Sequence, residues 1–239
     1  MQCSAEGSLN KMLKNSPDWK FTEELNCFDQ GYRVVAGIDE VGRGCLAGPL
    51  VASAVVMPGD KQLAWYKRVK DSKLLTANQR EELAPYIHET ALAAGTGVVE
   101  AYLIDQLGMT AAVHLAMSLA VAQLQPQPDF LLIDYLTIPS LKLPQKGVVN
   151  GDTLCFSIAC ASIVAKVHRD HMMQDIDCRY PGYGLARNKG YGTQEHLAGL
   201  RELGPSPVHR WLFEPVRNIA RISFKEWTER RAAEGIHGT

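Results

Sequence analysis

The feature that most constrains the fold is a long segment beyond the middle of the chain, residues 157–178, with the sequence SIACASIVAKVHRDHMMQDIDC. This run predicts one long helix, which Pro181 ends because proline cannot continue a helix. The first half of the segment is apolar almost all round, so it needs cover on more than one side. We therefore expect this helix to lie against a β-sheet.

Alternating strand-like and helix-like segments supply that sheet. The strand-like runs are short and rich in β-branched residues, and the Thr76-to-Gln79 spacing is that of a capping box at a helix start. The predicted strands are 32–38, 50–57, 95–101 and 130–133, and the other predicted helices are 76–89 and 110–124. This alternation predicts an α/β fold built in layers.

The domain organisation follows from the same patterns. A chain of 239 residues, 46% of them hydrophobic and 21% charged, can bury one sizeable core. We expect a loosely attached N-terminal extension over residues 1–30 with one short helix, a main domain over residues 31–224, and a C-terminal tail over residues 225–239.

Charge and cysteine usage restrict the classes of function. With 25 Lys and Arg against 26 Asp and Glu, the chain has no global basic field, so any nucleic-acid site has to be a local patch. Residues 179–221 contain such a candidate, with seven basic and three acidic residues around the aromatic side chains Tyr180, Tyr183, Tyr191 and Trp211. Six scattered cysteines and no membrane-length apolar run predict free thiols in a cytoplasmic protein that is neither secreted nor membrane-inserted.

Four acids at the ends of predicted core elements are the strongest functional signal. Asp39 and Glu40 follow a buried strand, Asp134 ends the run FLLID, and Asp152 precedes the long helix. Each acid alone is more typical of a turn, a cap or a surface ion pair. Together, and without Cys or His, they favour Mg²⁺ or Mn²⁺, the ions of phosphate chemistry. Because neighbouring strand residues face opposite ways, a shared site also predicts that the strand ends or bends at residues 39–42.

Two other ligands have to be weighed. Residues 42–47, GRGCLA, formally match a dinucleotide fingerprint and would suggest an NAD-dependent oxidoreductase. However, Pro49 and a β-branched run follow where that motif needs a helix, and Asp39 and Glu40 would repel a pyrophosphate. Zinc would have only His168 and His171 as a nearby pair, and these are expected to face solvent.

Several segments resemble the ribonuclease HII family. They are GIDEVGRGCLAGP at residues 37–49, DSKLLT, LLID, GDTLCFSIACASIVAKVHRD, YGLARNKGYGT and HRWLFEPVR, in family order over most of the chain. The resemblance implies a ribonuclease-H-like mixed β-sheet flanked by helices, with a helical C-terminal part. It also implies a metal-dependent endoribonuclease acting on RNA–DNA hybrids and on DNA duplexes that contain ribonucleotides.

The resemblance also implies residue roles. Asp39, Glu40, Asp134 and Asp152 would be the catalytic, metal-binding carboxylates. Gly42, Arg43 and Gly44 would form a loop that reads the 2′-hydroxyl, and Tyr191 would pack on the sugar. Arg43, Lys73, Ser162 and Lys166 would contact the substrate phosphates. Without the resemblance, the loop reads as a tight turn, Tyr191 as packing, and Ser162 with Lys166 as a solvated helix face.

The chain departs from the family pattern at three positions. Tyr135 stands where glycine is usual, Asn150 replaces a common lysine, and Gly108 lies where a substrate-contacting asparagine is frequent. None of these is a carboxylate. The related ribonuclease HIII type is disfavoured, since it has a longer N-terminal domain and usually lacks the Gly-Arg-Gly triplet.

The resemblance, together with the four carboxylates, implies a monomer that cuts RNA in RNA–DNA duplexes by two-metal-ion hydrolysis, leaving a 3′-hydroxyl and a 5′-phosphate. Two alternatives remain open at this point. One is a non-catalytic hybrid-binding protein, against which the intact carboxylates argue. The other is a different nuclease or transposase of the same broad fold.

Overall fold

The computed structural model describes the chain except for residues 1–20, 60–62, 221–222, 224, 227 and 230–239. The first twenty residues of the predicted extension and most of the predicted C-terminal tail therefore lie outside the described residues. The chain forms two compact units. Of the described residues, the sheet unit comprises those from 21 to 41, 50 to 98 and 113 to 169, and the helical unit comprises those from 42 to 49, 99 to 112 and 170 to 229.

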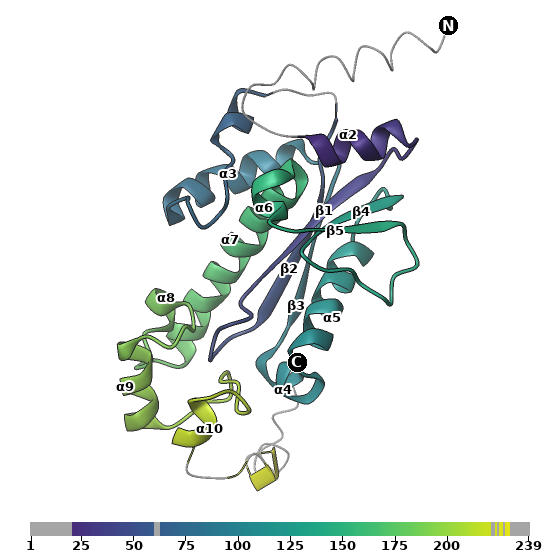
Figure 1. Ribbon diagram of the computed structural model, residues 1–239. Coiled ribbons are helices and arrows are strands. Elements are labelled where there is room, and N and C mark those ends of the chain that lie inside the picture. Colours follow the sequence, from purple (N-terminus) through teal and green to yellow (C-terminus); the bar gives the residue numbers. More distant parts are fainter. Residues whose placement is uncertain (1–20, 60–62, 221–222, 224, 227, 230–239) are drawn as a thin grey trace, which may run out of the picture. The chain divides into compact units, whose positions relative to one another are not determined.

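The sheet unit is built on a mixed five-stranded sheet in the order β3-β2-β1-β4-β5 (Figure 1). Its central strand β1 pairs antiparallel with β2 and parallel with β4, and β4 pairs parallel with β5. This confirms the predicted mixed sheet. The strands are β1 (Val35–Val41), β2 (Leu50–Val56), β3 (Ala93–Val99), β4 (Phe130–Asp134) and β5 (Gln145–Val148).

Helices cover both faces of this sheet. The helices and helical turns with residues in the sheet unit are α2 (Thr22–Asp29), the 3₁₀ turn η1 (Ala64–Arg68), α3 (Ala77–Thr90), α5 (Met109–Ala122), α6 (Gly151–Leu154) and α7 (Phe156–Arg179). Figure 1 shows α5 and α7 on opposite sides of the sheet.

Glycines allow these helices to approach the strands closely. A Cβ atom on Gly37 of β1 would lie 2.2 Å from the backbone of Ser157 in α7, and one on Gly97 of β3 would lie 2.0 Å from the carbonyl oxygen of Ala116 in α5. Both distances are far inside van der Waals contact. The apolar first half of α7 thus lies directly on the sheet, as its sequence predicts.

The N-terminal segment packs into the sheet unit from residue 21 onward. The short helix expected there is α2, but its surroundings differ from a loose attachment, because Phe21 and Leu25 are buried in a core cluster with Phe156. The rings of Phe21 and Phe156 are 5.0 Å apart. Burial of these apolar side chains, more than the weak helix pattern of the segment, fixes α2 in place.

Local sequence signals placed most of the other elements, although β1 begins and ends three residues later than the predicted strand 32–38. The capping box at α3 is present, with the Thr76 hydroxyl accepting from the Gln79 amide and the Gln79 side chain accepting from the Thr76 amide. The strand β5 and the helix α4 (Ala101–Leu107) were not predicted, since neither has a clear apolar period. The five cysteines that the structure describes are all free thiols.

The helical unit contains α4, the end of α7, α8 (Leu185–Asn188), α9 (Gln194–Leu203) and α10 (Val216–Ile219). Its core gathers apolar side chains from the 42–49 segment, from α7 and from the C-terminal helices: Leu46, Ala47, Met173, Ile176, Tyr183, Leu185, Leu200 and Val216. This is the helical C-terminal part expected from the sequence. None of the helices in the described part of the chain combines the length and hydropathy that a membrane crossing requires.

Candidate active site

Two neighbouring parallel strands carry acids at the same edge of the sheet. Ile38 of β1 lies opposite Ile133 of β4, so the next residue of each strand is an aspartate, Asp39 or Asp134. Asp39 is 6% exposed, and β4 ends at Asp134. The parallel register therefore brings together two of the predicted carboxylates.

Strand β1 ends soon after the acidic pair. It stops at Val41, and Gly42 takes a φ of +99°, a value that glycine adopts without strain. The expectation that the strand ends or bends at residues 39–42 is thus confirmed. Strand alternation places Asp39 and Glu40 on opposite faces, yet their carboxylates still repel one another.

The third acidic segment is joined directly to Asp134. The Gly151 amide donates to Asp134 Oδ1 at 2.8 Å, and Asp152 is the second residue of the short helix α6. A Cβ atom on Gly151 would lie 3.2 Å from the same oxygen. Asp152 therefore lies inside a turn anchored on Asp134 and is not the N-cap of the long helix.

Two polar links connect the carboxylates to the segment before α3. Lys73 Nζ lies 3.0 Å from Asp152 Oδ2, with the Lys73 side chain 78% exposed and Asp152 buried. The buried hydroxyls of Ser72 and Ser162 are 2.8 Å apart, and Ser162 also hydrogen-bonds the Asp39 carboxylate. Lys166 follows Ser162 by one helical turn and is partly buried. The sheet unit thus holds seven of the predicted site residues: Asp39, Glu40, Lys73, Asp134, Asp152, Ser162 and Lys166.

The electrostatics of these acids favour a cation. Burial raises the pKa of Asp39 well above its ordinary value, repulsion by Glu40 and Asp134 adds to the rise, and the Ser162 hydrogen bond opposes it. Burial likewise raises the pKa of Asp134, with repulsion by Asp152 adding to it and the Gly151 amide opposing it. A bound divalent ion would offset both the burial of these carboxylates and the repulsion between them.

The donor set fits a hard divalent cation, because it offers carboxylate oxygens and no thiolate or imidazole. In the part of the chain that the structure describes, no three His, Cys, Asp or Glu side chains are arranged to hold a metal ion as they stand. Lys73 and the Gly151 amide engage oxygens of Asp152 and Asp134 instead.

The remaining predicted residues belong to the helical unit. Gly42, Arg43 and Gly44 form a turn in which Arg43 and Gly44 are exposed, and a Cβ atom on Gly44 would meet nothing within 4 Å. Tyr191 follows α8 and is 45% exposed. The turn therefore leaves room for a ligand to approach its backbone.

Only part of the basic and aromatic patch predicted over residues 179–221 faces solvent. Tyr183, Arg210 and Trp211 are buried in the helical unit, and the exposed Arg187 and Arg217 form ion pairs with acids next to them. Composition alone could not show this, because it does not indicate which charges face solvent. Tyr191 is the predicted aromatic side chain that stays exposed.

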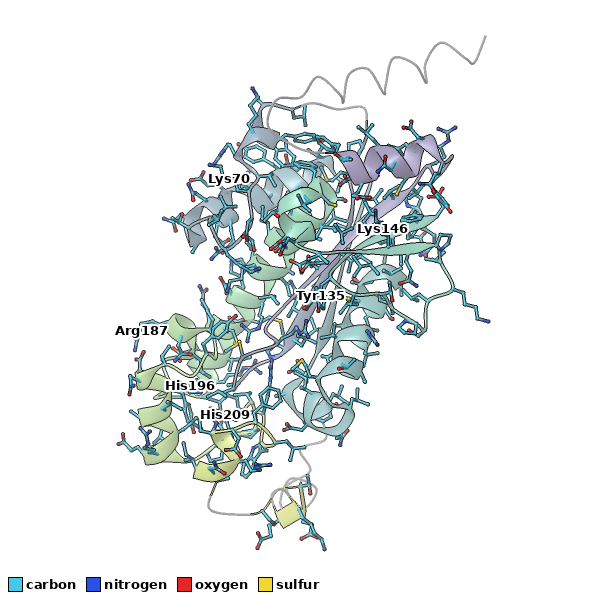
Figure 2. The ribbon with its side chains drawn as sticks, viewed as in Figure 1. Lys70, Tyr135, Lys146, Arg187, His196 and His209 are labelled. Atoms are coloured by element: carbon cyan, nitrogen blue, oxygen red, sulfur yellow. The ribbon has the colours of Figure 1, made fainter. Side chains whose placement is uncertain are left out.

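The three departures from the family pattern all lie at left-handed backbone positions. The φ angles are +64° at Tyr135, +56° at Asn150 and +78° at Gly108. Glycine and asparagine tolerate this conformation, whereas a bulky residue is strained in it. The structure thus explains why glycine suits position 135, and it shows Tyr135 to be 70% exposed (Figure 2).

The alternative ligands lack support. Residues 42–49 form turns and lead into β2, so no helix opens where a dinucleotide motif requires one. His168 and His171 are both exposed, as the sequence predicts.

Sequence reasoning did not identify several buried polar residues that lie near the predicted site residues. Ser72 is one, and the others are buried groups of the helical unit, namely Asn188, His196, His209 and Arg210. What marks these polar residues as important is their burial, which the sequence does not show and the folded structure does.

The mixed sheet, with acids at the ends of two parallel strands, defines the class of ribonuclease-H-like nucleases. Solved structures agree on the fold. Ribonuclease H2 from Pyrococcus horikoshii OT3 matches 78% of this chain and 97% of its own, with a TM-score of 0.66 and 24% identity. Bst-RNase HIII in complex with Mn²⁺ matches 83% of this chain and 72% of its own, with a TM-score of 0.61 and 19% identity.

Sequence relatives identify the family within that class. The ribonuclease HII family model matches residues 36–227. A ribonuclease HII of Dehalococcoides mccartyi is 51% identical over 85% of this chain and 95% of its own length, and one of Enterococcus faecalis is 43% identical over 87% and 82%. The chain belongs to the ribonuclease HII family.

Proposed function

We propose that this member of the ribonuclease HII family is an endonuclease that cuts the RNA strand of RNA–DNA hybrids and also cuts at single ribonucleotides embedded in duplex DNA. The products would be a 3′-hydroxyl and a 5′-phosphate. The observation that carries the proposal is the acidic edge of the sheet, where Asp39 and Asp134 follow paired residues and the Asp152 turn is hydrogen-bonded to Asp134. Family membership supports endoribonuclease activity on hybrids.

The carboxylates of Asp39, Glu40, Asp134 and Asp152 would hold divalent ions, and we propose Mg²⁺ or Mn²⁺. Two such ions, when bound, activate the attacking water and stabilise the leaving oxygen of a phosphodiester. The chain itself then has to orient the acids and the substrate. Ser162 holds the Asp39 carboxylate, and the Gly151 amide holds Asp134, so both side chains have fixed directions.

Basic side chains would bind the phosphates. Lys73 is largely exposed, so its ammonium group is free to exchange the Asp152 carboxylate for a phosphate oxygen. Lys166 and the Ser162 hydroxyl offer donors from one face of α7, and Arg43 offers another from the helical unit.

Recognition of RNA would come from the helical unit. The backbone of Gly42, Arg43 and Gly44 would read the ribose 2′-hydroxyl, which is the group that distinguishes RNA from DNA. The exposed ring of Tyr191 would pack on the sugar at the junction between ribonucleotide and deoxyribonucleotide.

The test is cleavage of a DNA duplex that contains one ribonucleotide, with and without Mg²⁺ or Mn²⁺. We expect a metal-dependent cut at that residue and none in an all-DNA duplex. Cutting of the all-DNA duplex would indicate a different nuclease of the fold. Asp39→Asn should abolish cleavage and spare binding, whereas binding without any wild-type cleavage would indicate a non-catalytic hybrid-binding protein.

The cellular role we propose is removal of misincorporated ribonucleotides and primer RNA, by a cytoplasmic monomer. Deleting the gene should raise the number of alkali-sensitive sites in genomic DNA, and an Asp39→Asn copy should not restore the normal number. Light scattering of the purified chain tests the monomer.

A further inference from the structure

A fully buried arginine braces the loop that carries Gly42, Arg43 and Gly44. Arg210 is 0% exposed, and its Nη1 donates to the Arg43 carbonyl oxygen at 2.9 Å. Its Nη2 and Nε donate to the Gly48 carbonyl oxygen at 3.0 and 3.3 Å. A guanidinium group in this setting needs such partners, because burying an unsatisfied charge is costly.

The backbone next to Arg210 binds the same loop. The Arg210 amide donates to the Leu46 carbonyl oxygen at 2.8 Å, and the Gly48 amide donates to the Val208 carbonyl oxygen at 2.8 Å. Ala47 and His209 form an isolated β-bridge. The loop is thus held from residue 43 to residue 48, while Arg43 and Gly44 remain exposed to a ligand.

His209, next to Arg210, pairs with His196 of α9, and both histidines are labelled in Figure 2. The pair extends to the turn of Tyr191. His209 Nε2 lies 3.0 Å from His196 Nε2, and His196 Nδ1 lies 2.9 Å from the Tyr191 carbonyl oxygen. At the other end, the Ser206 amide donates to His209 Nδ1 at 3.0 Å.

The groups at the two ends of this series of hydrogen bonds determine which nitrogen of each histidine carries the proton. The Ser206 amide can only donate, so His209 Nδ1 accepts and His209 Nε2 carries the proton. His209 then donates to His196 Nε2, which leaves the proton of His196 on Nδ1, facing the Tyr191 carbonyl oxygen. Burial lowers the pKa of His209 to about 3 and also lowers the pKa of His196, in keeping with two neutral rings.

The two recognition elements are also joined directly. The Leu46 amide donates to the Gly190 carbonyl oxygen at 2.7 Å, and a Cβ atom on Gly190 would lie 2.3 Å from the Ala47 carbonyl oxygen. The Gly190 amide in turn donates to the buried side chain of Asn188. The loop and the tyrosine turn therefore pack against each other and against one segment, residues 206–210.

We infer that residues 206–210 are a positioning element for ribose recognition, in which Arg210 sets the Gly42–Gly44 backbone and the His209–His196 pair sets the turn of Tyr191. This inference rests on the proposed function. A backbone group that reads one hydroxyl and a ring that packs on the adjacent sugar have to keep a fixed separation. None of these residues needs to touch the substrate.

The first test uses Arg210→Lys in the full chain, since lysine keeps the charge but lacks the planar fork that binds two carbonyl groups. Discrimination is the ratio of dissociation constants for an all-DNA duplex and the same duplex with one ribonucleotide, measured in an Asp39→Asn background. We expect this ratio to fall roughly tenfold, the equivalent of about 1.4 kcal/mol. Arg217→Lys, at an exposed arginine of the same unit, is the matched control and should leave it unchanged.

The second test compares His196→Asn with His196→Ala. Both variants remove the acceptor for His209, so both should lose thermal stability. Asparagine keeps a donor near the Nδ1 position, so it should retain the Tyr191 hydrogen bond and several-fold more discrimination than alanine. This pair decides the matter if Arg210→Lys does not fold.

The outcomes distinguish the positioning role of residues 206–210 from the proposed function. Absence of wild-type cleavage would overturn the proposed function. A cleaving, discriminating wild type whose two His196 variants bind with equal discrimination would overturn the positioning role and leave the proposed function standing. Unchanged discrimination in a folded Arg210→Lys variant would also overturn it.

Discussion

Gly37→Ala tests how closely α7 has to approach β1 for the acidic edge to work. The new Cβ atom would lie 2.2 Å from the Ser157 carbonyl carbon and 2.4 Å from the Ile158 amide nitrogen. The first distance is about 1.2 Å short of the 3.4 Å at which ordinary contact begins. Because both neighbours are backbone atoms, the helix or the strand has to move by about that amount.

The displacement should affect catalysis as well as stability. Ser162 of α7 orients Asp39 of β1, so a shift of the helix changes the position of the carboxylate relative to its partner. Overpacking of this kind costs about 1–3 kcal/mol of unfolding free energy. A misplacement of about 1 Å can lower a rate roughly 100-fold. We expect kcat to fall by about that factor in protein that is still folded.

Gly97→Ala is the matched control, because its Cβ atom would lie 2.0 Å from the Ala116 carbonyl oxygen on the opposite face of the sheet. Urea unfolding measures the stability loss of both variants, and cleavage at saturating substrate measures kcat. Both should be destabilised, but only Gly37→Ala should lose the catalytic rate. Equal kcat values in the two folded variants would refute the reasoning.

Three further predictions concern charged groups. Glu24 accepts hydrogen bonds from Ser157, and burial raises the pKa of the Glu24 carboxyl group. The stabilising contribution of Glu24 is therefore complete below the unfolded pKa of about 4.3 and is lost as pH rises through the folded pKa. Urea unfolding of Glu24→Gln should show a weaker decline than the wild type over that window, and parallel curves would contradict this. For His209 the sign is opposite: its folded pKa is lowered to about 3, so its contribution is present above about pH 6.5 and is lost as pH falls towards 3, a loss that His209→Gln should reduce in the same assay. Mn²⁺ should raise the Tm of the wild type and not of Asp134→Asn, and an equal rise in both would argue against the carboxylate site.

The sequence by itself determined the elements and the acidic ends of the strands. The capping box at Thr76, the apolar length of α7 and the β-branched run of β2 are local patterns, and each formed the predicted element within one residue at either end, whereas β1 begins and ends three residues later than predicted. Local patterns suffice here because a helix or a strand is set mainly by periodicity and end signals. Asp39 and Asp134 could be assigned to strand ends for the same reason.

The tertiary structure alone decided which polar groups are buried and what they bind. Arg210 was counted in a basic patch, but its partners Arg43 and Gly48 lie more than 160 residues away in the chain. No local pattern encodes such a pair. The same holds for Glu24, read as part of a loose extension, which hydrogen-bonds Ser157 at the start of α7. A charge is retained in the interior only where folding brings distant donors or acceptors to it, and that condition depends on packing and not on the residues beside it in the sequence.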